Sequence, residues 1–517
     1  MILYHAITSY HLLKFAVHKL RYHCFDDAVL LIPNFMVHKP VQNYEEDSIF
    51  SKVIEFSWEK NNLSPKSIFE DIEHFLEHHL GKNYRQEITE YNIARAEYFF
   101  GSWAVENGIQ FQWFEDGDGR FTQPEPIMKD DERINQIRFK LARENGLYTG
   151  NNINVTKKFI KFSSQTGEFS KEDIVDFDVV KEFQQLSNDD RKKLLKFFNV
   201  PKNLTIQKNS CLMLTQHFSN IRILSYQEQA LCYQLTIDYY MNRYHTYFKW
   251  HPTDFTPYPS FMENISMISA HFPSELLNLL VECKFKIGAS INSTGILSLN
   301  SICEKILTFN QDYIKTFWYN HQYYFAAKLL EIVTYKQACT IGINDIQLDN
   351  MCQFGLDTSL KLPQHTECLA DAEQLEECDI YIIGDLEECH SSILKFCEKR
   401  KNSIFVFLSF HKKSIFRLFI ENPLFIVKEI KLFDITQNNL QLLDCLTIGI
   451  LVPDKKIFGR IQSMKYVKLL LNTGVKSVVE EISDTDTKIA VLKGMLKATE
   501  EQLLQCTLKL NEYETKK

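Results

Sequence analysis

Short apolar runs alternate with amphipathic segments over the first part of the chain. Residues 28–33 form a continuous apolar run that stops at a proline, which predicts a buried strand, and residues 109–114 predict another. A first strand is expected over residues 2–7. Residues 68–80 carry apolar side chains at helical spacing and predict an amphipathic helix. This alternation predicts an α/β domain over residues 1–150.

The pattern becomes polar over residues 151–205, which are rich in Lys, Asp and Asn. Ser187 resembles a helix N-cap there, so we expect linker helices that cross between two domains. A second α/β domain is predicted over residues 206–328. Its expected elements are strands at 211–216 and 285–288, a strand that ends near Lys249, and a helix over 226–242.

A third region follows, from 329 to 455, with four short apolar runs separated by helix-like segments. The runs are residues 338–343, 380–384, 404–408 and 446–450. They predict a Rossmann-like parallel sheet of unknown role, although no G-x-G-x-x-G follows any of them to indicate a dinucleotide site. The tail, residues 456–517, has apolar or small side chains at 3-4 spacing from 489 to 513. It predicts either a coiled coil that forms a homo-oligomer or a helix packed on the body.

Composition limits the possible partners. The 517 residues are 45% hydrophobic and 24% charged, as in a soluble globular protein. The 58 basic and 66 acidic side chains give a net charge of −8 without a long basic stretch, which argues against nucleic acid as a partner. The 13 cysteines include no C-x-x-C pair, which indicates reduced thiols. With no signal peptide and no apolar run near ~18 residues, we expect a cytoplasmic protein, with peripheral contact with the inner membrane left open.

The first candidate for chemistry is an acidic turn after the strand at 109–114. Glu115 and Asp116 precede Gly117, and Asp118 follows it. A carboxylate at the end of a strand can accept a proton from an attacking sugar hydroxyl. The alternatives are a plain acidic turn and a D-x-D metal signature, for which two carboxylates are a thin ligand set.

The second candidate is His251, between Lys249 and Pro252 at a strand end. Proline biases the preceding residue toward an extended backbone. An imidazole fixed in this way can donate a hydrogen bond to a phosphate oxygen, or protonate it as the nucleotide departs. A simple His-Pro turn is the alternative.

Hydroxyl-rich and polar segments provide further candidates. Residues 288–295 follow a strand and open an apolar helical stretch, so Ser293, Thr294 and Gly295 can form a phosphate cradle or an ordinary helix cap. Residues 8–11, which include Ser9, Tyr10 and His11, can line an acceptor cleft or cap a helix. Gln216 and His217 end the strand at 211–216 and are expected to face an inter-domain cleft.

In this order the motifs resemble those of bacterial sialyltransferases of the lipooligosaccharide sialyltransferase and polysialyltransferase type. That family shares a D/E-D/E-G motif, an H-P motif and a paired Ser/Ser-or-Thr motif. They are similar here to Glu115-Asp116-Gly117, His251-Pro252 and Ser293-Thr294. The stretch Tyr10-His11-Leu12-Leu13 is similar to the family's first loop. The resemblance covers roughly residues 1–325.

The resemblance implies a GT-B architecture, in which two Rossmann-like domains face each other across a cleft. It implies inverting, metal-independent transfer from CMP-sialic acid to a surface or capsular glycan, without a cofactor. Asp116 would be the general base, with Glu115 as the alternative, and His251 the general acid or phosphate stabiliser. Ser293 and Thr294 would hold the CMP phosphate. The other expected substrate-binding residues are Lys249, Pro252, Gly295, Gly117, Gln216, Ser9, Tyr10 and His11.

Two departures from the family pattern bear on this assignment. Asp118-Gly119 lengthens the acidic turn, which leaves the choice of base open by one residue, and residues 329–517 have no counterpart in the family core. Two other hypotheses stay open. One is a GT-B transferase with another CMP- or CDP-activated donor, such as Kdo or glycerol phosphate, and the other is a non-catalytic scaffold.

Overall fold

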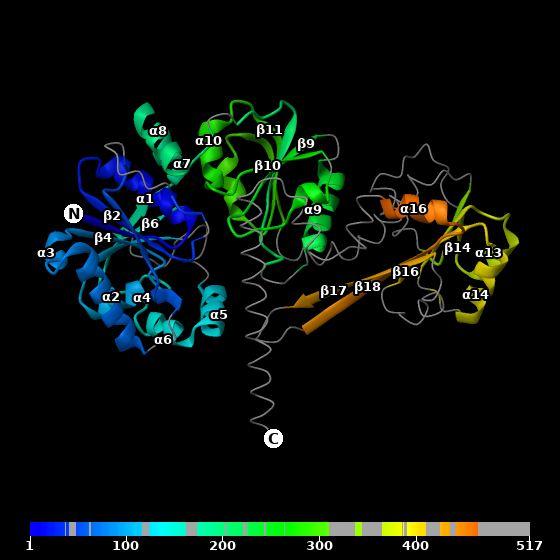
Figure 1. The fold of residues 1–517 in the computed structure, drawn as a ribbon, viewed down its shortest axis with the longest axis horizontal. Coiled ribbons are helices and arrows are strands. Elements are labelled where there is room, and N and C mark those ends of the chain that lie inside the picture. The colour runs from blue at the N-terminus through cyan, green and yellow to red at the C-terminus, as the bar shows by residue number, and fades with distance from the viewer. Residues whose placement is uncertain are drawn as a thin grey trace, which may run out of the picture. The chain divides into compact units, whose positions relative to one another are not determined.

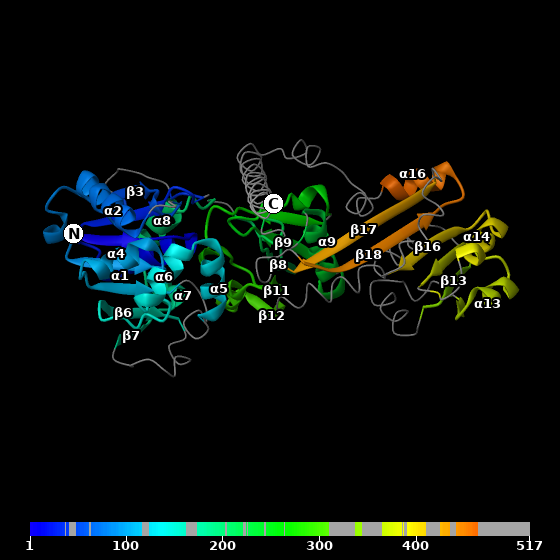
Figure 2. The same cartoon turned by 90° about the horizontal axis from the view of Figure 1, so that it is seen from below.

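The structure is a computed structural model of the whole chain. It describes residues 1–463 apart from 37, 41–47, 61–63, 116–123, 162–172, 202–203, 221–223, 225, 242–243, 263, 310–336, 344–363, 385, 387–389, 410–423 and 435–440. Contacts between Cα atoms divide it into two compact units. The first comprises residues 1–208, 269–288 and 294–306, and the second 209–268, 289–293 and 307–517. Three separate β-sheets are described below, each by itself (Figures 1 and 2).

The first sheet contains seven parallel strands in the order β3-β2-β1-β4-β5-β6-β7. The strands are β1 Ile2–His5, β2 Ala28–Pro33, β3 Lys52–Phe56, β4 Glu90–Ala94, β5 Phe111–Phe114, β6 Val155–Ile160 and β7 Ile174–Asp176. Strand order reverses between β1 and β4. This reversal is the topological switch point, where ligands bind in open α/β sheets.

Helices cover both faces of this sheet. Their bounds are α1 Ser9–Tyr22, α2 Pro65–Leu80, α3 Tyr84–Glu87, α4 Phe99–Glu106, α5 Glu125–Ile134, α6 Gln136–Glu144, α7 Val179–Gln184 and α8 Asn188–Phe197, with the 3₁₀ turn η1 Trp58–Lys60. One group is α1 with α7 and α8, and the other is α4 with α2 and α6. Figure 1 shows the two groups on opposite sides of the sheet.

Local sequence explains where the predicted helices begin. Ser64 caps α2 by accepting a hydrogen bond from the N–H of Ser67, and Pro65 occupies the first turn, where its missing N–H is tolerated. Gly81 ends this helix at φ +93°, a conformation that favours glycine. Ser187 caps α8 in the same way, through the N–H of Asp190, as its sequence predicts.

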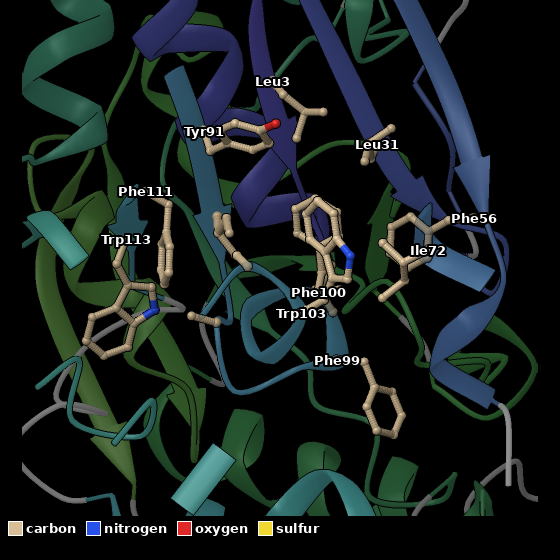
Figure 3. Packing of buried hydrophobic residues seen from close by; sticks show 14 of the residues in the cluster. Leu3, Leu31, Phe56, Ile72, Tyr91, Phe99, Phe100, Trp103, Phe111 and Trp113 are labelled. Atoms are coloured by element: carbon tan, nitrogen blue, oxygen red, sulfur yellow. The ribbon is translucent and has the colours of Figure 1, made fainter. Parts of the chain in front are cut away.

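The core of this sheet is aromatic. Phe56, Phe99, Phe100 and Trp103 are at most 1% exposed, and they pack from β3 and α4 with aliphatic side chains of α2 (Figure 3). Large rings bury much apolar area with few torsions to immobilise, so they contribute strongly to stability.

The first sheet extends beyond residue 150, where the sequence analysis places the end of the domain. β6 and β7 add to its edge and lie in the predicted linker. The boundary is displaced because Lys157 and Lys158 interrupt the apolar pattern of β6, so the segment resembles a polar connection rather than a strand. The helices expected in 151–205 are present as α7 and α8.

The second sheet has five strands in the order β10-β9-β8-β11-β12. They are β8 Ser210–Leu214, β9 His245–Lys249, β10 Ile265–Ile268, β11 Phe285–Ile291 and β12 Cys303–Phe309. The accompanying helices are α9 Tyr226–Tyr240 and α10 Leu277–Leu280, with the 3₁₀ turns η4 Tyr258–Ser260, η5 Ser274–Leu276 and η6 Thr294–Leu299. β8 is parallel to β9. Cys283, just before β11, donates to the carbonyl of Ile206, just before β8, so these two strands start at the same edge.

The third sheet has the order β14-β13-β15-β16-β18-β17. Its elements are β13 Ala338–Ile341, β14 Gln364–Thr366, α13 Leu369–Gln374, β15 Ile380–Ile383, α14 His390–Lys399, β16 Ile404–Ser409, β17 Phe425–Asp434, β18 Gln441–Leu451 and α16 Lys455–Ser463. All four predicted apolar runs are strands, but β18 pairs antiparallel with β16 and β17, which corrects the prediction of a wholly parallel sheet. β17 was not predicted because Lys428, Glu429 and Lys431 interrupt its apolar residues, so it shows neither an unbroken apolar run nor a strict alternation.

The α/β class with parallel Rossmann-like sheets is therefore confirmed. The predicted helix at 489–513 falls outside the described residues. Among the helices that are described, none combines the length and the apolar character needed to cross a lipid bilayer.

Candidate active site

Glu115 directly follows β5, and its side chain is buried. Its Oε1 accepts a 2.6 Å hydrogen bond from the backbone N–H of Lys161 and lies 3.8 Å from Nζ of Lys14 in α1. The Lys14 ammonium also donates to the Glu115 carbonyl oxygen at 3.1 Å. A buried ion pair is tolerated when hydrogen bonds satisfy both partners. Glu115 thus joins α1 to the ends of β5 and β6.

Lys161 extends this network within the first unit. Its Nζ donates a 2.7 Å hydrogen bond to Oγ of Ser298, in the η6 turn that begins at Thr294 of the Ser293-Thr294 motif. Neither Lys14 nor Lys161 was predicted from the sequence, because a lysine at the end of a strand or inside a helix usually has its head group in water. The other residues of the acidic turn, Asp116 and Gly117, lie outside the described residues.

The segment after β1 forms the start of α1. Thr8 is the N-cap: its Oγ1 accepts from the N–H of His11, and Nδ1 of His11 accepts from the N–H of Thr8 at 3.1 Å. This is a capping box in which a histidine replaces the usual Glu or Gln. Ser9 and Tyr10 are half-buried in the first helical turn. Thr8 and His11 therefore cap a helix, which is one of the two roles that the sequence left open for residues 8–11.

Arg95 lies at the switch point of the first sheet, immediately after β4. It adopts φ +55°, which is uncommon for a residue with a side chain and is found often at functional sites. Its Nε donates to Oε1 of Glu97 at 2.5 Å, and its guanidinium lies 4.9 Å from the Tyr98 ring centroid. Arg95 was not predicted, because the switch point depends on the strand order of the sheet, which no local sequence pattern specifies.

A buried charged cluster lies close by in space, since the Arg138 guanidinium is 4.2 Å from the centroid of the same Tyr98 ring. Glu59 accepts a 3.1 Å hydrogen bond from the N–H of Phe99 and lies 3.9 Å from Arg138, which also pairs with Asp131. The hydroxyl of Tyr148 donates to Asp131 at 2.9 Å. Burial raises the pKa of Glu59 to about 8, and Arg138, shared with Asp131, only partly opposes this shift.

In the second sheet, His251 follows β9 with its orientation fixed. Its backbone N–H donates to Oγ1 of Thr215 at 3.0 Å. Its Nδ1 accepts the N–H of Thr253 at 3.3 Å and lies 2.9 Å from the Thr253 hydroxyl. Because Nδ1 accepts a backbone N–H, the neutral ring carries its proton on Nε2. A ring in this state presents a donor on its other nitrogen.

His217 and Gln216 follow the adjacent strand β8. The rings of His217 and His251 stack, with centroids 4.4 Å apart and planes 25° apart. The main chain of Gln216 is held by two buried side chains: its N–H donates to Tyr233, and its carbonyl accepts from Gln229. The two strand ends that the sequence analysis singled out therefore converge at one edge of this sheet.

Asp254 is the centre of a buried hydrogen-bond network beside this edge. Its carboxylate accepts from the N–H of Thr256 at 3.0 Å, the hydroxyl of Tyr258 at 2.8 Å and the amide of Gln229 at 3.0 Å. Burial raises the pKa of Asp254 to about 6. Of its neighbours along the chain, Lys249 is buried at the end of β9 and Pro252 is half-buried.

The backbone of residues 288–295, which include Ser293 and Thr294, differs from the prediction. β11 continues through Ile291, so residues 288–291 belong to a strand rather than to a loop, and η6 is a 3₁₀ turn of six residues instead of an α-helix. The reason is that β-branched and small residues continue the strand pattern past Gly288. Ser293 is half-buried and follows β11, while Thr294 is exposed and Gly295 half-buried.

No protein-family model matches the chain, and no curated protein matches it. Among solved structures, the chain is similar to S. aureus MnaA in complex with UDP, with 12% identity, a TM-score of 0.35, and coverage of 68% of this chain and 90% of that one. A UDP-N-acetylglucosamine 2-epimerase is similar with 10% identity and a TM-score of 0.33, over 69% of this chain and 92% of that one. Spinosyn rhamnosyltransferase SpnG is similar with 10% identity and a TM-score of 0.34, over 70% of this chain and 91% of that one. With every TM-score below 0.5, these likenesses assign no activity.

Proposed function

We propose that the chain is a glycosyltransferase that moves sialic acid from CMP-sialic acid to a glycan acceptor, with inversion and without a metal. The observation that carries the proposal is His251, whose Nδ1 accepts the N–H of Thr253 and whose ring stacks on His217 at the end of a parallel strand. Such a site suits a phosphate, because ligands of parallel sheets bind beyond the carboxyl ends of the strands.

In this proposal His251 acts on the leaving group. The Nε2–H donates to an oxygen of the departing CMP phosphate and stabilises the negative charge that develops as the glycosidic bond breaks. Ser293 follows β11 and supplies a hydroxyl to the same phosphate, and His217 supports the His251 ring. Gln216, Lys249 and Pro252 shape the nucleotide side of the site.

The acceptor hydroxyl loses its proton to a carboxylate of the acidic turn. Oε1 of Glu115 already accepts the Lys161 N–H and is buried beside Lys14. This engagement favours Asp116 as the general base and gives Glu115 a positioning role.

The test is a donor panel with labelled CMP-sialic acid, CMP-Kdo and CDP-glycerol, in which nucleotide release and sugar transfer are both measured. We expect release from CMP-sialic acid alone. Release only from CMP-Kdo or CDP-glycerol would replace the donor, and absence of calorimetric CMP binding at millimolar concentration would favour the non-catalytic scaffold.

The same assay separates the two carboxylates. Asp116→Asn should lower turnover about 10²–10⁴-fold without changing the thermal midpoint, as expected for loss of a general base. Glu115→Gln should lower the midpoint, because it leaves the buried Lys14 ammonium without its counter-charge. The opposite pattern would make Glu115 the base.

A further inference from the structure

A second cluster of potential ligands lies at the other edge of the first sheet. His18 comes from α1, His23 follows its last turn, and Glu90 is the first residue of β4. One ligand atom from each of the three residues can be chosen so that all three lie within 4.8 Å of one another. Nε2 of His23 and Oε1 of Glu90 are 3.4 Å apart. This edge contains the amino ends of the strands, opposite to the edge with Glu115.

Each of the three side chains is oriented by a further polar group. Nδ1 of His23 pairs with the carboxylate of Asp26 at 2.9 Å, and the amide of Asn92 donates to Oε1 of Glu90 at 2.8 Å. Nδ1 of His18 lies 3.1 Å from the Tyr4 hydroxyl. In both histidines Nδ1 is therefore engaged, which leaves Nε2 as the nitrogen for a ligand. Metal-binding histidines are typically held in this way, through the ring nitrogen that does not bind the metal.

The His18 ring is also fixed by packing. It is 3% exposed and makes edge contacts with Phe114 and Phe159, with ring centroids 5.1 and 5.0 Å away. His23 and Glu90 are half-buried, which leaves a route from solvent.

We propose that His18, His23 and Glu90 form a binding site for a divalent transition metal of the zinc type. Two imidazoles and one carboxylate match the ligands that Zn²⁺ prefers, and water would complete a tetrahedral set. Binding requires the three side chains to move slightly toward one another. Ligand atoms that surround a metal tetrahedrally at about 2.0–2.2 Å are closer together than the 4.8 Å limit within which these three atoms lie.

The role of this site is structural. A bound ion would link the end of α1 to the start of β4, next to β1, and so stabilise the sheet whose opposite edge carries Glu115. Because the proposed transfer step needs no metal, removal of the ion should lower the thermal midpoint and leave the transfer step itself metal-independent.

The experiment uses the full chain, freed of metal by a chelator and kept reduced with a non-thiol reductant. Titration with Co²⁺ should give the visible bands of a tetrahedral nitrogen and oxygen site, without the near-ultraviolet thiolate band that cysteine ligands produce. Zn²⁺ should displace the Co²⁺ and raise the thermal midpoint.

Variants then assign the site. His23→Ala and Glu90→Gln should each abolish the Co²⁺ spectrum, and Asp26→Asn should weaken binding about 10–100-fold. His74→Ala and Glu70→Gln, exposed side chains on α2, are the matched controls and should bind as the unaltered chain does. Circular dichroism of each metal-free variant checks that it is folded.

Three results would overturn the proposal. They are no binding by the unaltered chain, a thiolate spectrum, and Co²⁺ binding that survives both His23→Ala and Glu90→Gln.

Discussion

The ammonium nitrogen of Lys161 lies 2.7 Å from the hydroxyl oxygen of Ser298, to which it donates a hydrogen bond. The main-chain N–H of the same lysine donates to Glu115. One residue thus connects the acidic turn after β5 with the η6 turn after β11, two segments that are far apart in the sequence. The position of Glu115 therefore depends on a contact that no local pattern contains.

This contact predicts an energetic coupling. Lys161→Met and Ser298→Ala should each lower the free energy of unfolding, by about 1.5–3 kcal/mol for a hydrogen bond with a charged partner. The double variant should lose less than the sum of the two changes, as measured by denaturant unfolding. Lys66→Met, at an exposed helix pair, is the control and should stay within about 0.5 kcal/mol. Additive losses from the first two changes would show that the contact does not exist in solution.

His251 is predicted to act in the transfer step. His251→Ala should lower kcat with CMP-sialic acid about 10²–10⁴-fold, because the departing phosphate loses its hydrogen-bond donor. His245→Ala is the matched control: it alters the same strand at its other end, where Nε2 pairs with Ser266. Initial rates of CMP release measure both variants. Equal losses in the two would mean that His251 contributes only to folding.

Asp254 is predicted to be a positioning residue. Asp254→Asn keeps the shape of the side chain but replaces one acceptor oxygen with a donor, which faces either the Thr256 N–H at the Oδ1 position or the Tyr258 hydroxyl at the Oδ2 position. Stability should fall by about 1–3 kcal/mol, and KM for the donor should rise more than kcat falls. Thermal melts and donor titrations test this, with the exposed Asp189→Asn as control. A fall in kcat alone would instead indicate direct participation.

Glu59 predicts a pH dependence of stability. Its pKa is raised by burial to about 8 in the folded chain and is near 4.3 when unfolded. Between these two pKa values the folded state binds more protons than the unfolded state, so the free energy of unfolding falls as the pH rises. The stabilising contribution of the protonated Glu59 is therefore complete below about pH 4.3 and is lost as the pH rises through 8. Unfolding midpoints across this range should fall less steeply in Glu59→Gln. An unchanged slope would show that Glu59 is ionised in the fold.

Much of the secondary structure follows from local sequence. Ser64-Pro65 and Ser187 mark helix starts because their hydroxyls satisfy backbone N–H groups within three residues. The strand at 28–33 follows from its unbroken apolar run, since a central parallel strand is buried on both faces. Strand ends such as His251 could be identified as site candidates because ligands bind at the carboxyl ends of parallel strands.

Other features depend on contacts between distant segments. The sequence pattern at β6 is interrupted by Lys157 and Lys158, and only pairing with β5 makes it a strand. The antiparallel placement of β18 results from pairing with β16, which an apolar run alone cannot specify.

The sequence by itself determined the α/β class, most element positions and the residue types available for chemistry, because these depend on interactions within a few residues of the chain. Only the tertiary structure decided which side chains meet. The pairing of Glu115 with Lys14, the stacking of His217 on His251, and the grouping of His18 with His23 and Glu90 are examples. Burial, which raises the pKa of Glu59, likewise exists only once the sheet and its helices have packed together.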